Sequence, residues 1–382
     1  MDYQQLKQDS VTLHREHQGK IETTSRISVK SKHDLSLAYS PGVAEPCILI
    51  KNNPQEANNL TLKGRTIAVI SDGSAVLGLG NIGGLAGLPV MEGKSLLFKE
   101  FAGLDSFPIV LDTQDTEEII RTIKAIAPTF GGINLEDISA PRCFEIEERL
   151  KAELDIPIMH DDQHGTAIVV LAGLLNALKV VHKNLADIQI VISGPGAAGT
   201  AVAKLLSLAG AKNIILLDSK GILSRDRIDL NDHKQKLLEI SNPKNISGNL
   251  RDALRNADVF IGVSGPNIAT KEDIQLMAND GIVFALANPV PEIMPEEAKA
   301  GGARIVATGR SDYPNQVNNV LAFPGIFRGA IDGKKTKITD TMKLAAAHAL
   351  SGLIETPTEE MILPDAFDPR VVHAVAEAVM KS

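Results

Sequence analysis

Two pairs of acidic residues follow apolar segments of the sequence, at the points where each segment ends. Glu136 and Asp137 follow "INL", and Asp161 and Asp162 follow "IPIMH". Taken alone, such a pair is more often a solvated turn than a binding site. Open α/β sheets, however, bind ligands at the carboxyl ends of their strands, and carboxylates suit Mg²⁺ or Mn²⁺ better than Zn²⁺. We therefore predict a divalent metal site formed by Glu136, Asp137 and a carboxylate of the Asp161–Asp162 pair.

Two histidines flank the second acidic pair in the segment "IMHDDQHGT". His160 and His164 could donate hydrogen bonds to the metal-binding carboxylates. Local capping, or a satisfied imidazole in the interior, explains them at least as well. The sequence leaves both interpretations open.

A glycine-rich turn follows the strand-like segment "IQIVIS" and has the pattern of a dinucleotide-binding loop. In "GPGAAG", Gly194 permits a tight turn and Gly196 lets the backbone approach a pyrophosphate. Gly199 lets the following helix pack on the strand, and Ala197 and Ala198 complete the turn at the helix N-terminus, which attracts the anion. The alternative is a glycine-rich turn of an ordinary parallel sheet, which this strand–helix–strand context disfavours.

The next apolar strand ends in Asp218, which can accept a hydrogen bond from a ribose hydroxyl group. A carboxylate at this place usually favours NAD, because it repels the 2′-phosphate of NADP. Ser219 and Lys220 follow directly and could accommodate that phosphate. We predict NAD or NADP as the cofactor, with NAD preferred.

A second glycine pattern, Gly78, Gly80 and Gly83, lacks this context. The segment "DGSAVLGLGNIGGLAGLP" separates the strand before it from any helical pattern and is broken by further glycines and Pro89. We predict a flexible, close-packed loop here, in which the glycines serve tight turns.

The elements that position these residues alternate along the chain. Short β-branched strands alternate with helix-patterned stretches, which indicates parallel sheets covered by helices and an α/β fold class. We predict an N-terminal α/β domain at residues 1–160 that carries the substrate and metal residues, with an oligomer arm at about 1–35. A Rossmann-type, doubly wound parallel-sheet domain at 161–382 follows, entered through a helix that begins at Thr166. The predicted strands are 65–70, 106–112, 156–160, 188–193, 213–218, 258–264, 281–287 and 303–307.

The composition excludes several functional classes. A formal net charge of -8, 3% aromatic residues and no Trp argue against a nucleic-acid binder. Cys47 and Cys143 are the only cysteines, which favours a reducing compartment. The N-terminus lacks the apolar core of a signal peptide, and the apolar run at 166–178 falls short of a membrane span. We expect a cytoplasmic protein with no membrane association.

Motifs over nearly the whole chain resemble those of the malic enzymes of the short bacterial type. They are "AYSPGVAEPC", "GLPVMEGKSLLFKEFAG", "INLEDISAPRCFEIE", "PIMHDDQHGTA", "GPGAAG", "ALANPVPEI" and "NQVNNVLAFPG", in the order found in that family. The resemblance implies oxidative decarboxylation of L-malate to pyruvate and CO₂, with reduction of NAD(P)⁺ and a divalent ion that stabilises the enolate. It also implies a homo-oligomer, most simply a dimer.

The resemblance further implies the roles of single residues. Lys94 is the base and Tyr39 the acid, while Asp161 assists the proton transfer of Lys94 and Asp162 joins Glu136 and Asp137 on the metal. A lysine base requires a depressed pKa, which burial and a nearby dication would provide. Read without the resemblance, Lys94 is a surface charge and Tyr39 a packing residue.

The malate carboxylates and the carboxamide would meet Asn288, Asn318 and Asn319. Their alternative role is turn formation, which Asn288 before Pro289 fits well. Larger members of the family carry an arginine in the glycine-rich loop for a malate carboxylate, whereas this chain has Ala75 at the matching place. Recognition must then rest on the metal, the asparagines and the backbone amides of that loop.

Two other functions compete with this reading. A malolactic reaction would use the same site, retain the cofactor and release lactate; the malolactic proteins resemble the longer form of the family, which weakens this alternative. A nucleotide-sensing regulator would retain the dinucleotide loop without catalysis, and the intact set of carboxylates argues against it.

Overall fold

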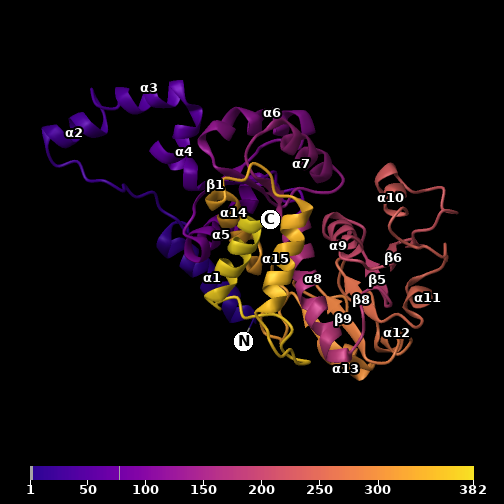
Figure 1. The fold of residues 1–382 in the computed structure, drawn as a ribbon. Helices are drawn as coiled ribbons and strands as arrows, with labels where there is room; N and C mark the ends of the chain where they lie inside the picture. Colours follow the sequence, from indigo (N-terminus) through magenta and orange to yellow (C-terminus); the bar gives the residue numbers. More distant parts are fainter. Residues whose placement is uncertain (1–2, 77) are drawn as a thin grey trace.

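The computed structural model describes residues 3–76 and 78–382, which form two mainly parallel sheets with helices packed around them (Figure 1). The first sheet has the order β2-β1-β3-β4, and every neighbouring pair is parallel. Its strands are β1 (Thr66–Ser71), β2 (Asp105–Val110), β3 (Gly132–Leu135) and β4 (Ile158–His160). The helices between them are α5 (Gly84–Ala102), α6 (Thr116–Ile126) and α7 (Arg142–Glu153), with a short 3₁₀ turn η3 (Ala127–Thr129). We call this part the N-terminal unit.

The second sheet has the order β10-β9-β8-β5-β6-β7, the strand order of a Rossmann fold. Its strands are β5 (Gln189–Ser193), β6 (Asn213–Asp218), β7 (Gly221–Ile222), β8 (Val259–Gly262), β9 (Gly281–Ala285) and β10 (Ala303–Thr308). The helices are α9 (Ala197–Leu208), α10 (Asp232–Leu237), α11 (Leu250–Leu254), α12 (Lys271–Ile274) and α13 (Pro295–Ala300). We call this part the C-terminal unit. The predicted α/β class and Rossmann-type sheet are confirmed; the short antiparallel strand β7 was not predicted.

Helix α8 (Asp161–Val181) connects the two units and packs against α9. It begins at Asp161, earlier than the predicted start at Thr166, because the two aspartates form its first turn, where negative charge suits the helix dipole. By length and composition α8 would suit a membrane span, although the apolar run at 166–178 alone is shorter than one. Within the described residues, 72% of its most apolar window is buried inside the protein, as in a core helix.

The C-terminal helices return to the N-terminal unit. After η4 (Asn319–Leu321), helix α14 (Phe323–Asp332) packs on α5, and α15 (Asp340–Gly352) and α16 (Arg370–Lys381) complete the layer (Figure 1). Phe98 of α5 makes edge contacts with Phe323 and Phe327, with ring centroids 4.8 and 5.5 Å apart. The predicted boundary at residue 160 coincides with the end of β4, although the packed core continues across it.

Helix α5 begins within the glycine-rich segment after β1, which was predicted to be a loop as far as Pro89. Helix α5 begins at Gly84, and the additional glycines and Pro89 lie within it. A Cβ on Gly84 would lie 2.7 Å from the carbonyl oxygen of Leu111, so this glycine lets the helix approach the end of β2. The glycines serve close packing here and do not interrupt the helix.

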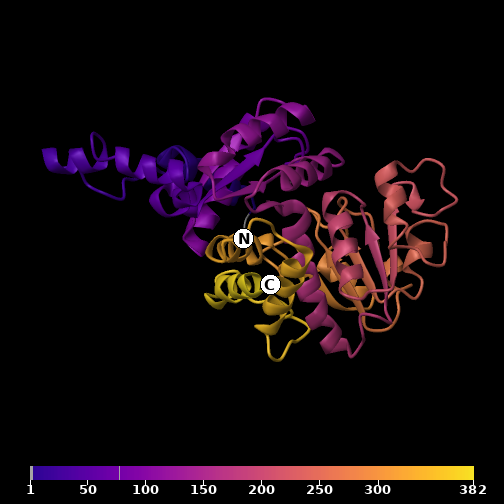
Figure 2. The ribbon, with the colours of Figure 1, turned by 45° about the horizontal axis from the view of Figure 1, so that its top comes forward.

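The N-terminal region includes an arm that projects from the body of the molecule (Figures 1 and 2). Helix α1 (Tyr3–His17) lies near α5, while the arm carries α2 (Lys32–Ala38), α3 (Ala44–Asn52), η1 (Pro54–Glu56) and α4 (Ala57–Leu60), before η2 (Leu62–Arg65) enters β1. Helices α2, α3 and α4 bury none of their residues. The arm therefore extends further along the chain than the predicted residues 1–35.

Candidate active site

A cleft of about 1170 Å³ lies between the two units and is lined by loops at the carboxyl ends of their strands. Most of the predicted site residues meet in it, although they lie far apart in the sequence. Those that line it are Lys94, Glu136, Asp137, Asp162, Gly196, Ala197, Ala198, Asn288, Asn318 and Asn319. Gly194, Gly199 and Asp161 lie behind its surface.

Lys94 is the buried cation of this cleft, and only 7% of its surface is exposed. Its Nζ donates to Oδ2 of Asp161 at 2.7 Å and lies 2.9 Å from Oε1 of Glu136. The ammonium also lies over the ring of Phe323, 4.3 Å from its centroid. Helix α5 thus holds one ammonium between carboxylates that follow β3 and β4.

The predicted metal ligands lie together and are called the metal group: Glu136, Asp137 and Asp162. Each offers an oxygen, and these atoms lie within 4.8 Å of one another. The backbone N–H of Asp137 donates to Asp162 at 2.7 Å, and Asn134 donates to Glu136 at 2.7 Å. Asp137 has a positive φ of 53°, so the chain turns sharply as β3 ends and both acidic side chains can reach the cleft. Three converging carboxylates match the oxygen ligands that Mg²⁺ and Mn²⁺ prefer.

The charges in this group interact strongly. Burial raises the pKa of the Glu136 carboxyl well above its usual range; Lys94 opposes this effect, and the three neighbouring aspartates add to it. Burial disfavours the Lys94 ammonium, but Asp161 and Glu136 outweigh it and hold the pKa of Lys94 above its usual value. The protein groups alone therefore raise the pKa of Lys94, and its expected depression depends on a nearby dication. Repulsion among the carboxylates remains, and a dication would relieve it.

The two histidines beside this group have different partners. His160 Nε2 lies 3.1 Å from Oδ2 of Asp162, whereas His164 Nε2 lies 2.9 Å from Oε2 of Glu147. Glu147 also accepts a hydrogen bond from the backbone N–H of His160, at 3.0 Å. His160 therefore supports a candidate metal ligand directly, and His164 acts through Glu147.

The glycine-rich turn after β5 has the geometry of a cofactor loop. Gly194 has a positive φ of 104°, and a Cβ on Gly199 would lie 2.0 Å from the Gly194 carbonyl oxygen. A Cβ on Gly196, by contrast, would meet no atom within 4 Å, so the chain at this glycine borders open space. Gly196 is the N-cap of α9, whose N-terminus faces the cleft. This open turn at a helix N-terminus fits a pyrophosphate.

The buried carboxylate of Glu292 is hydrogen-bonded to two loops of the C-terminal unit, one after β8 and one after β9. Glu292 is fully buried and accepts hydrogen bonds from the backbone N–H groups of Ser264 and Ala287, both at 2.9 Å. These two residues follow β8 and β9 and line the cleft. Glu292 therefore fixes the spacing of two loops across the sheet from the glycine turn.

Asp218, at the end of β6, is engaged by cations. Arg227 donates to both of its oxygens, at 2.8 and 3.1 Å, and Lys234 donates at 2.5 Å. Burial alone would raise the pKa of Asp218, but these hydrogen bonds lower it to about 2. The carboxylate is therefore ionised, and Arg227 and Lys234 balance its charge. Its repulsion of a 2′-phosphate is weaker than the sequence suggested.

The glycine loop between β1 and α5 reaches the cleft at Ala75, Gly78 and Gly80. A Cβ on Gly78 would lie 2.3 Å from the Asn288 carbonyl oxygen, so the two units touch at this point. The backbone N–H of Ala75 donates to the Asp137 carbonyl group at 2.9 Å. The loop thus lies beside the metal group, as its proposed part in substrate binding requires.

Comparison with known proteins explains this assembly. Residues 18–151 match the family model "Malic enzyme, N-terminal domain", and residues 163–382 match "Malic enzyme, NAD binding domain". The chain belongs to the malic enzyme family. It is 58% identical to the NAD-dependent malic enzyme of Geobacillus stearothermophilus over 95% of this chain and 76% of that protein.

Two further relatives of the family are similar over nearly their full length. The bifunctional malic/malolactic enzyme of Bacillus subtilis is 53% identical over 99% of this chain and 93% of that protein. The crystal structure of the malic enzyme from Pyrococcus horikoshii has a TM-score of 0.94 and 52% identity, covering 98% of this chain and 90% of that one. The B. subtilis name shows that a malolactic relative can have this length, so the length argument against that alternative is wrong.

One residue assigned from the malic enzyme resemblance lies away from the cleft. Tyr39 is the C-cap of α2 on the projecting arm, 70% exposed, and it does not line the cleft. The structure brings together Lys94, Asp161 and the carboxylates within one chain, but not Tyr39.

Several residues of this malic enzyme site were missed in the sequence. Arg142 lies 3.0 Å from both Asp72 and Ser74 and so anchors the loop that carries Ala75. A Cβ on Gly165 would lie 1.9 Å from Oδ1 of Asp161, so a glycine is required beside that carboxylate. Gly165 stands in the conspicuous "HDDQHGT" segment, whereas no spacing singles out Arg142.

Proposed function

We propose that this member of the malic enzyme family catalyses the oxidative decarboxylation of L-malate to pyruvate and CO₂, with reduction of NAD(P)⁺. The observation that carries the proposal is the Lys94 ammonium held between Asp161 and Glu136 in the cleft that also contains the cofactor turn. Lys94, the three carboxylates of the metal group and the dinucleotide loop then surround the space in which malate would bind. When bound at the turn after β5, NAD(P)⁺ would supply the acceptor for the hydride from C2 of malate.

Lys94 takes the proton of the C2 hydroxyl group in this proposal. A dication beside Glu136 would lower the pKa of Lys94, and the ammonium could then give a proton to Asp161, the buried carboxylate that accepts its hydrogen bond at 2.7 Å. Asp161 is fully buried, which favours its neutral form and suits it to receive that proton. Asp161 is thus the route by which Lys94 becomes a base.

Glu136, Asp137 and Asp162 would hold Mg²⁺ or Mn²⁺. Their oxygens converge within 4.8 Å, and their mutual repulsion raises the pKa of Glu136, beyond the effect of burial, as a cation site requires. When bound, the ion supplies polarisation of the C2 carbonyl group and stabilisation of the enolate left as CO₂ departs. Asn134 and His160 orient two of these side chains.

Substrate recognition is assigned to Asn288, Asn318 and Asn319 and to the backbone of the loop at Ala75. All four line the cleft. Neutral amides orient the malate carboxylates and the nicotinamide carboxamide by hydrogen bonds. Arg142 is engaged with Asp72 and Ser74, so it supports the loop and does not replace the arginine of the larger enzymes.

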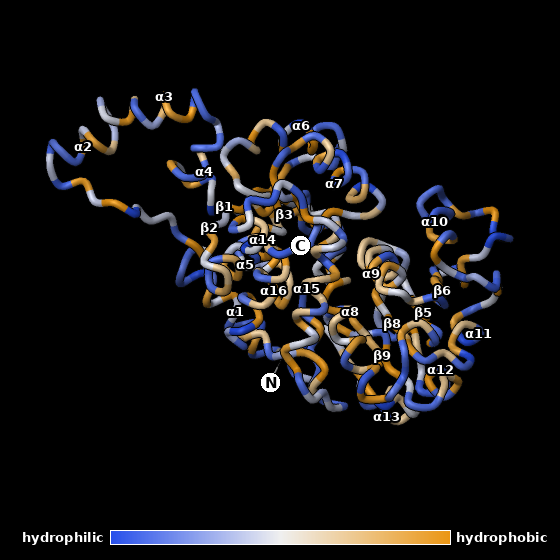
Figure 3. The backbone as a smooth tube through the Cα atoms, viewed as in Figure 1, coloured by the Kyte–Doolittle hydropathy of each residue, from blue (hydrophilic) through white to orange (hydrophobic). Residues whose placement is uncertain are grey.

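Tyr39 is proposed as the acid that protonates C3, and it reaches a cleft only through a second copy of the chain. Apolar stretches run along α2 and α3 of this arm (Figure 3). Leu35, Leu37, Ile48 and Leu49 are exposed there, which a solvent-facing arm would not need. Exposed apolar patches of this kind mark protein contacts. We therefore propose a homodimer in which the arm of one copy covers the cleft of the other and delivers Tyr39 to it.

We propose NAD as the preferred nucleotide, with NADP also accepted. Asp218 remains ionised beside the adenosine end of the predicted cofactor path, which suits the ribose of NAD. Arg227 and Lys234 neutralise it, and these cations would tolerate a 2′-phosphate. We also propose a cytoplasmic location, where Cys47 and Cys143 would remain the free thiols that they are in the structure.

Initial rates with L-malate test the function. NAD⁺ or NADP⁺ is supplied with Mg²⁺ or Mn²⁺, and the ion is then removed with a chelator. We expect NAD(P)H to form only with the ion and to return when the ion is restored. NAD(P)H formation that persists in chelator would contradict the metal assignment. Lactate formation without net NADH would instead support the malolactic reaction, which the B. subtilis relative's name keeps as the second candidate.

A further inference from the structure

A second lysine of the cleft, Lys20, comes from the segment that follows α1. It lines the cleft together with His14 and Gly93. Its side chain is partly buried, and its Nζ donates to the carbonyl oxygen of Pro89 in α5 at 2.7 Å. A Cβ on Gly93 would lie 3.8 Å from that Nζ. The ammonium of Lys20 therefore lies on the wall of the cleft, beside the residue that precedes Lys94.

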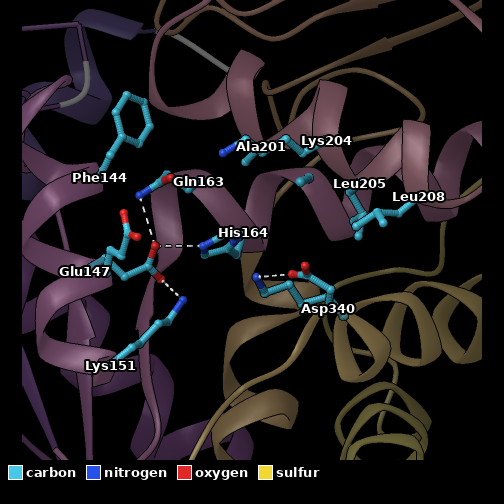
Figure 4. Close-up of a pocket in the computed structure, with 13 residues that line it drawn as sticks. Phe144, Glu147, Lys151, Gln163, His164, Ala201, Lys204, Leu205, Leu208 and Asp340 are labelled. Carbon is cyan, nitrogen blue, oxygen red and sulfur yellow. Dashed lines mark hydrogen bonds and ion pairs between the residues drawn. The ribbon is translucent and has the colours of Figure 1, made fainter. Parts of the chain in front are cut away.

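The ammonium of Lys20 has no carboxylate partner among the described residues. None of their carboxylates lies within 4.0 Å of its Nζ, and its printed neighbour is the carbonyl group of Pro89. Lys94 in the same cleft, by contrast, is engaged by two carboxylates. Lys151, which borders a smaller cavity, pairs with Glu147 at 2.5 Å (Figure 4). Lys20 is thus the cleft lysine that remains available to an anion.

Malate carries two carboxylates, and the other polar groups assigned to its recognition are neutral. The three asparagines of the cleft offer amides, and Arg142 is held behind the loop by Asp72. His14 donates through Nδ1 to the carbonyl oxygen of Ser10 at 2.6 Å, within its own helix. A substrate carboxylate that lies away from the metal group therefore finds its cation in Lys20.

We propose that Lys20 binds one carboxylate of the substrate and thereby helps the cleft to select dicarboxylates over monocarboxylates. The identity of the substrate as malate rests on the proposed function, whereas the binding of a dicarboxylate does not. Burial lowers the pKa of Lys20, and the charge of Glu92 restores it only in part, so a bound carboxylate would offset the cost of burial. A contact made equally to substrate and transition state lowers KM and leaves kcat nearly unchanged.

Lys20 also anchors the N-terminal segment to α5. Its backbone N–H donates to Glu92 at 3.2 Å, in addition to the bond from Nζ to Pro89. Lys63 is a matched control, because it is partly buried and its Nζ donates to the carbonyl oxygen of Phe130 at 2.7 Å, away from the cleft. Burial lowers the pKa of both lysines. Lys63→Met therefore removes the same kind of anchor without removing a cation from the cleft.

Initial rates with L-malate, NAD⁺ and Mn²⁺ on the full chain test the proposal. We expect Lys20→Met to raise the KM for malate by about tenfold to hundredfold and to keep kcat within about threefold of the wild type. Lys20→Arg retains a cation and should keep KM within about fivefold. Lys63→Met should match the wild type. An unchanged KM in Lys20→Met, or an equal rise in Lys63→Met, would overturn the proposal.

Pyruvate distinguishes the two carboxylates of malate, because it retains only the one at C1. Product inhibition by pyruvate is measured for the wild type and for Lys20→Met. If inhibition weakens in the variant, Lys20 binds the carboxylate at C1. If inhibition is unchanged while the KM for malate rises, Lys20 binds the carboxylate that leaves as CO₂.

Succinate binding, measured by titration calorimetry with Mn²⁺ present, separates this proposal from the proposed reaction. Succinate is a dicarboxylate without the C2 hydroxyl group, so its binding requires no turnover. If the wild type oxidises no malate but binds succinate, binding to Lys20→Met that is at least about tenfold weaker supports the carboxylate site, and equal binding overturns it. If the wild type neither oxidises malate nor binds succinate, both proposals are overturned.

Discussion

Lys94 donates a hydrogen bond to Asp161 at 2.7 Å, and both residues are buried. Lys94 lies in the middle of α5, whereas Asp161 is the first residue of α8, which connects the two units. The pair therefore stands at the junction between the carboxylate group and the helix that leads to the cofactor sheet. The segment "HDDQHGT" therefore contains two adjacent aspartates with different roles: Asp161 pairs with Lys94, and Asp162 belongs to the metal group.

Replacement of Lys94 by alanine should remove catalysis and spare the cofactor site. We expect Lys94→Ala to lower kcat by about 10²- to 10⁴-fold, as for the loss of a general base, while NAD(H) still binds. Lys99→Ala is the matched control, since Lys99 lies on the same helix and forms an exposed ion pair with Asp105. Steady-state rates and a nucleotide titration check both variants, and an active Lys94→Ala enzyme would exclude the assigned base.

Substitutions of the two adjacent aspartates, Asp161 and Asp162, should have different effects. Asp162→Asn removes a proposed ligand and should weaken Mn²⁺ binding by about tenfold or more. Asp161→Asn should leave Mn²⁺ binding nearly unchanged and lower kcat, because Asp161 contacts Lys94 and does not belong to the metal group. Mn²⁺ titration followed by rate measurement separates the effects. Equal loss of Mn²⁺ affinity in both variants would contradict the division of roles.

Glu292→Gln should loosen the two loops beside the cofactor. One oxygen of Glu292 would become an NH₂ group facing a backbone N–H, which costs about 1–3 kcal/mol of stability. We expect a lower Tm and a raised KM for the nucleotide, with the KM for malate less affected. Glu296→Gln, on an exposed turn of α13, is the control. Unchanged nucleotide affinity in Glu292→Gln would show that the loops hold their spacing without it.

Asp218 should control nucleotide choice independently of pH in the neutral range. Its folded pKa of about 2 lies below the ordinary 3.8, so the stability from its ion pairs is present above about pH 4 and is lost as the pH falls toward 2. Between pH 6 and 8 this carboxylate cannot titrate. We expect Asp218→Ser to shift kcat/KM toward NADP, since Arg227 and Lys234 become available to a 2′-phosphate. A shift toward NAD would refute this reading.

Tyr39 and Lys94 should complement each other between copies. Tyr39→Phe and Lys94→Ala are each expected to be inactive alone. A heterodimer that carries one of each has one cleft with both native residues if the arm is exchanged, so it should regain roughly half of the wild-type rate. Differently tagged chains, co-expressed and purified through both tags, provide that heterodimer. If the heterodimers are inactive while the wild type is active, Tyr39 and Lys94 of each site belong to the same copy.

The sequence predicted the site best where function depends on strand order. Apolar strands that end in acidic residues, and a glycine turn between a strand and a helix, locate ligand groups because parallel strands share one carboxyl edge. The prediction failed for α5, because glycines that permit close packing resemble glycines that break a helix. Arg142 and Glu147 escaped notice since single charged residues show their contacts only after folding. The distance of Tyr39 from Lys94 could not be predicted from the sequence, because it depends on the direction in which the arm projects.

The most direct test of the account is the stoichiometry of products from L-malate with NAD⁺ and Mn²⁺. Pyruvate and NADH are quantified in the same reaction, for the wild type and for Lys94→Ala. The account predicts equal amounts of pyruvate and NADH from the wild type and almost none from the variant. Lactate without NADH, or undiminished pyruvate from Lys94→Ala, would contradict it.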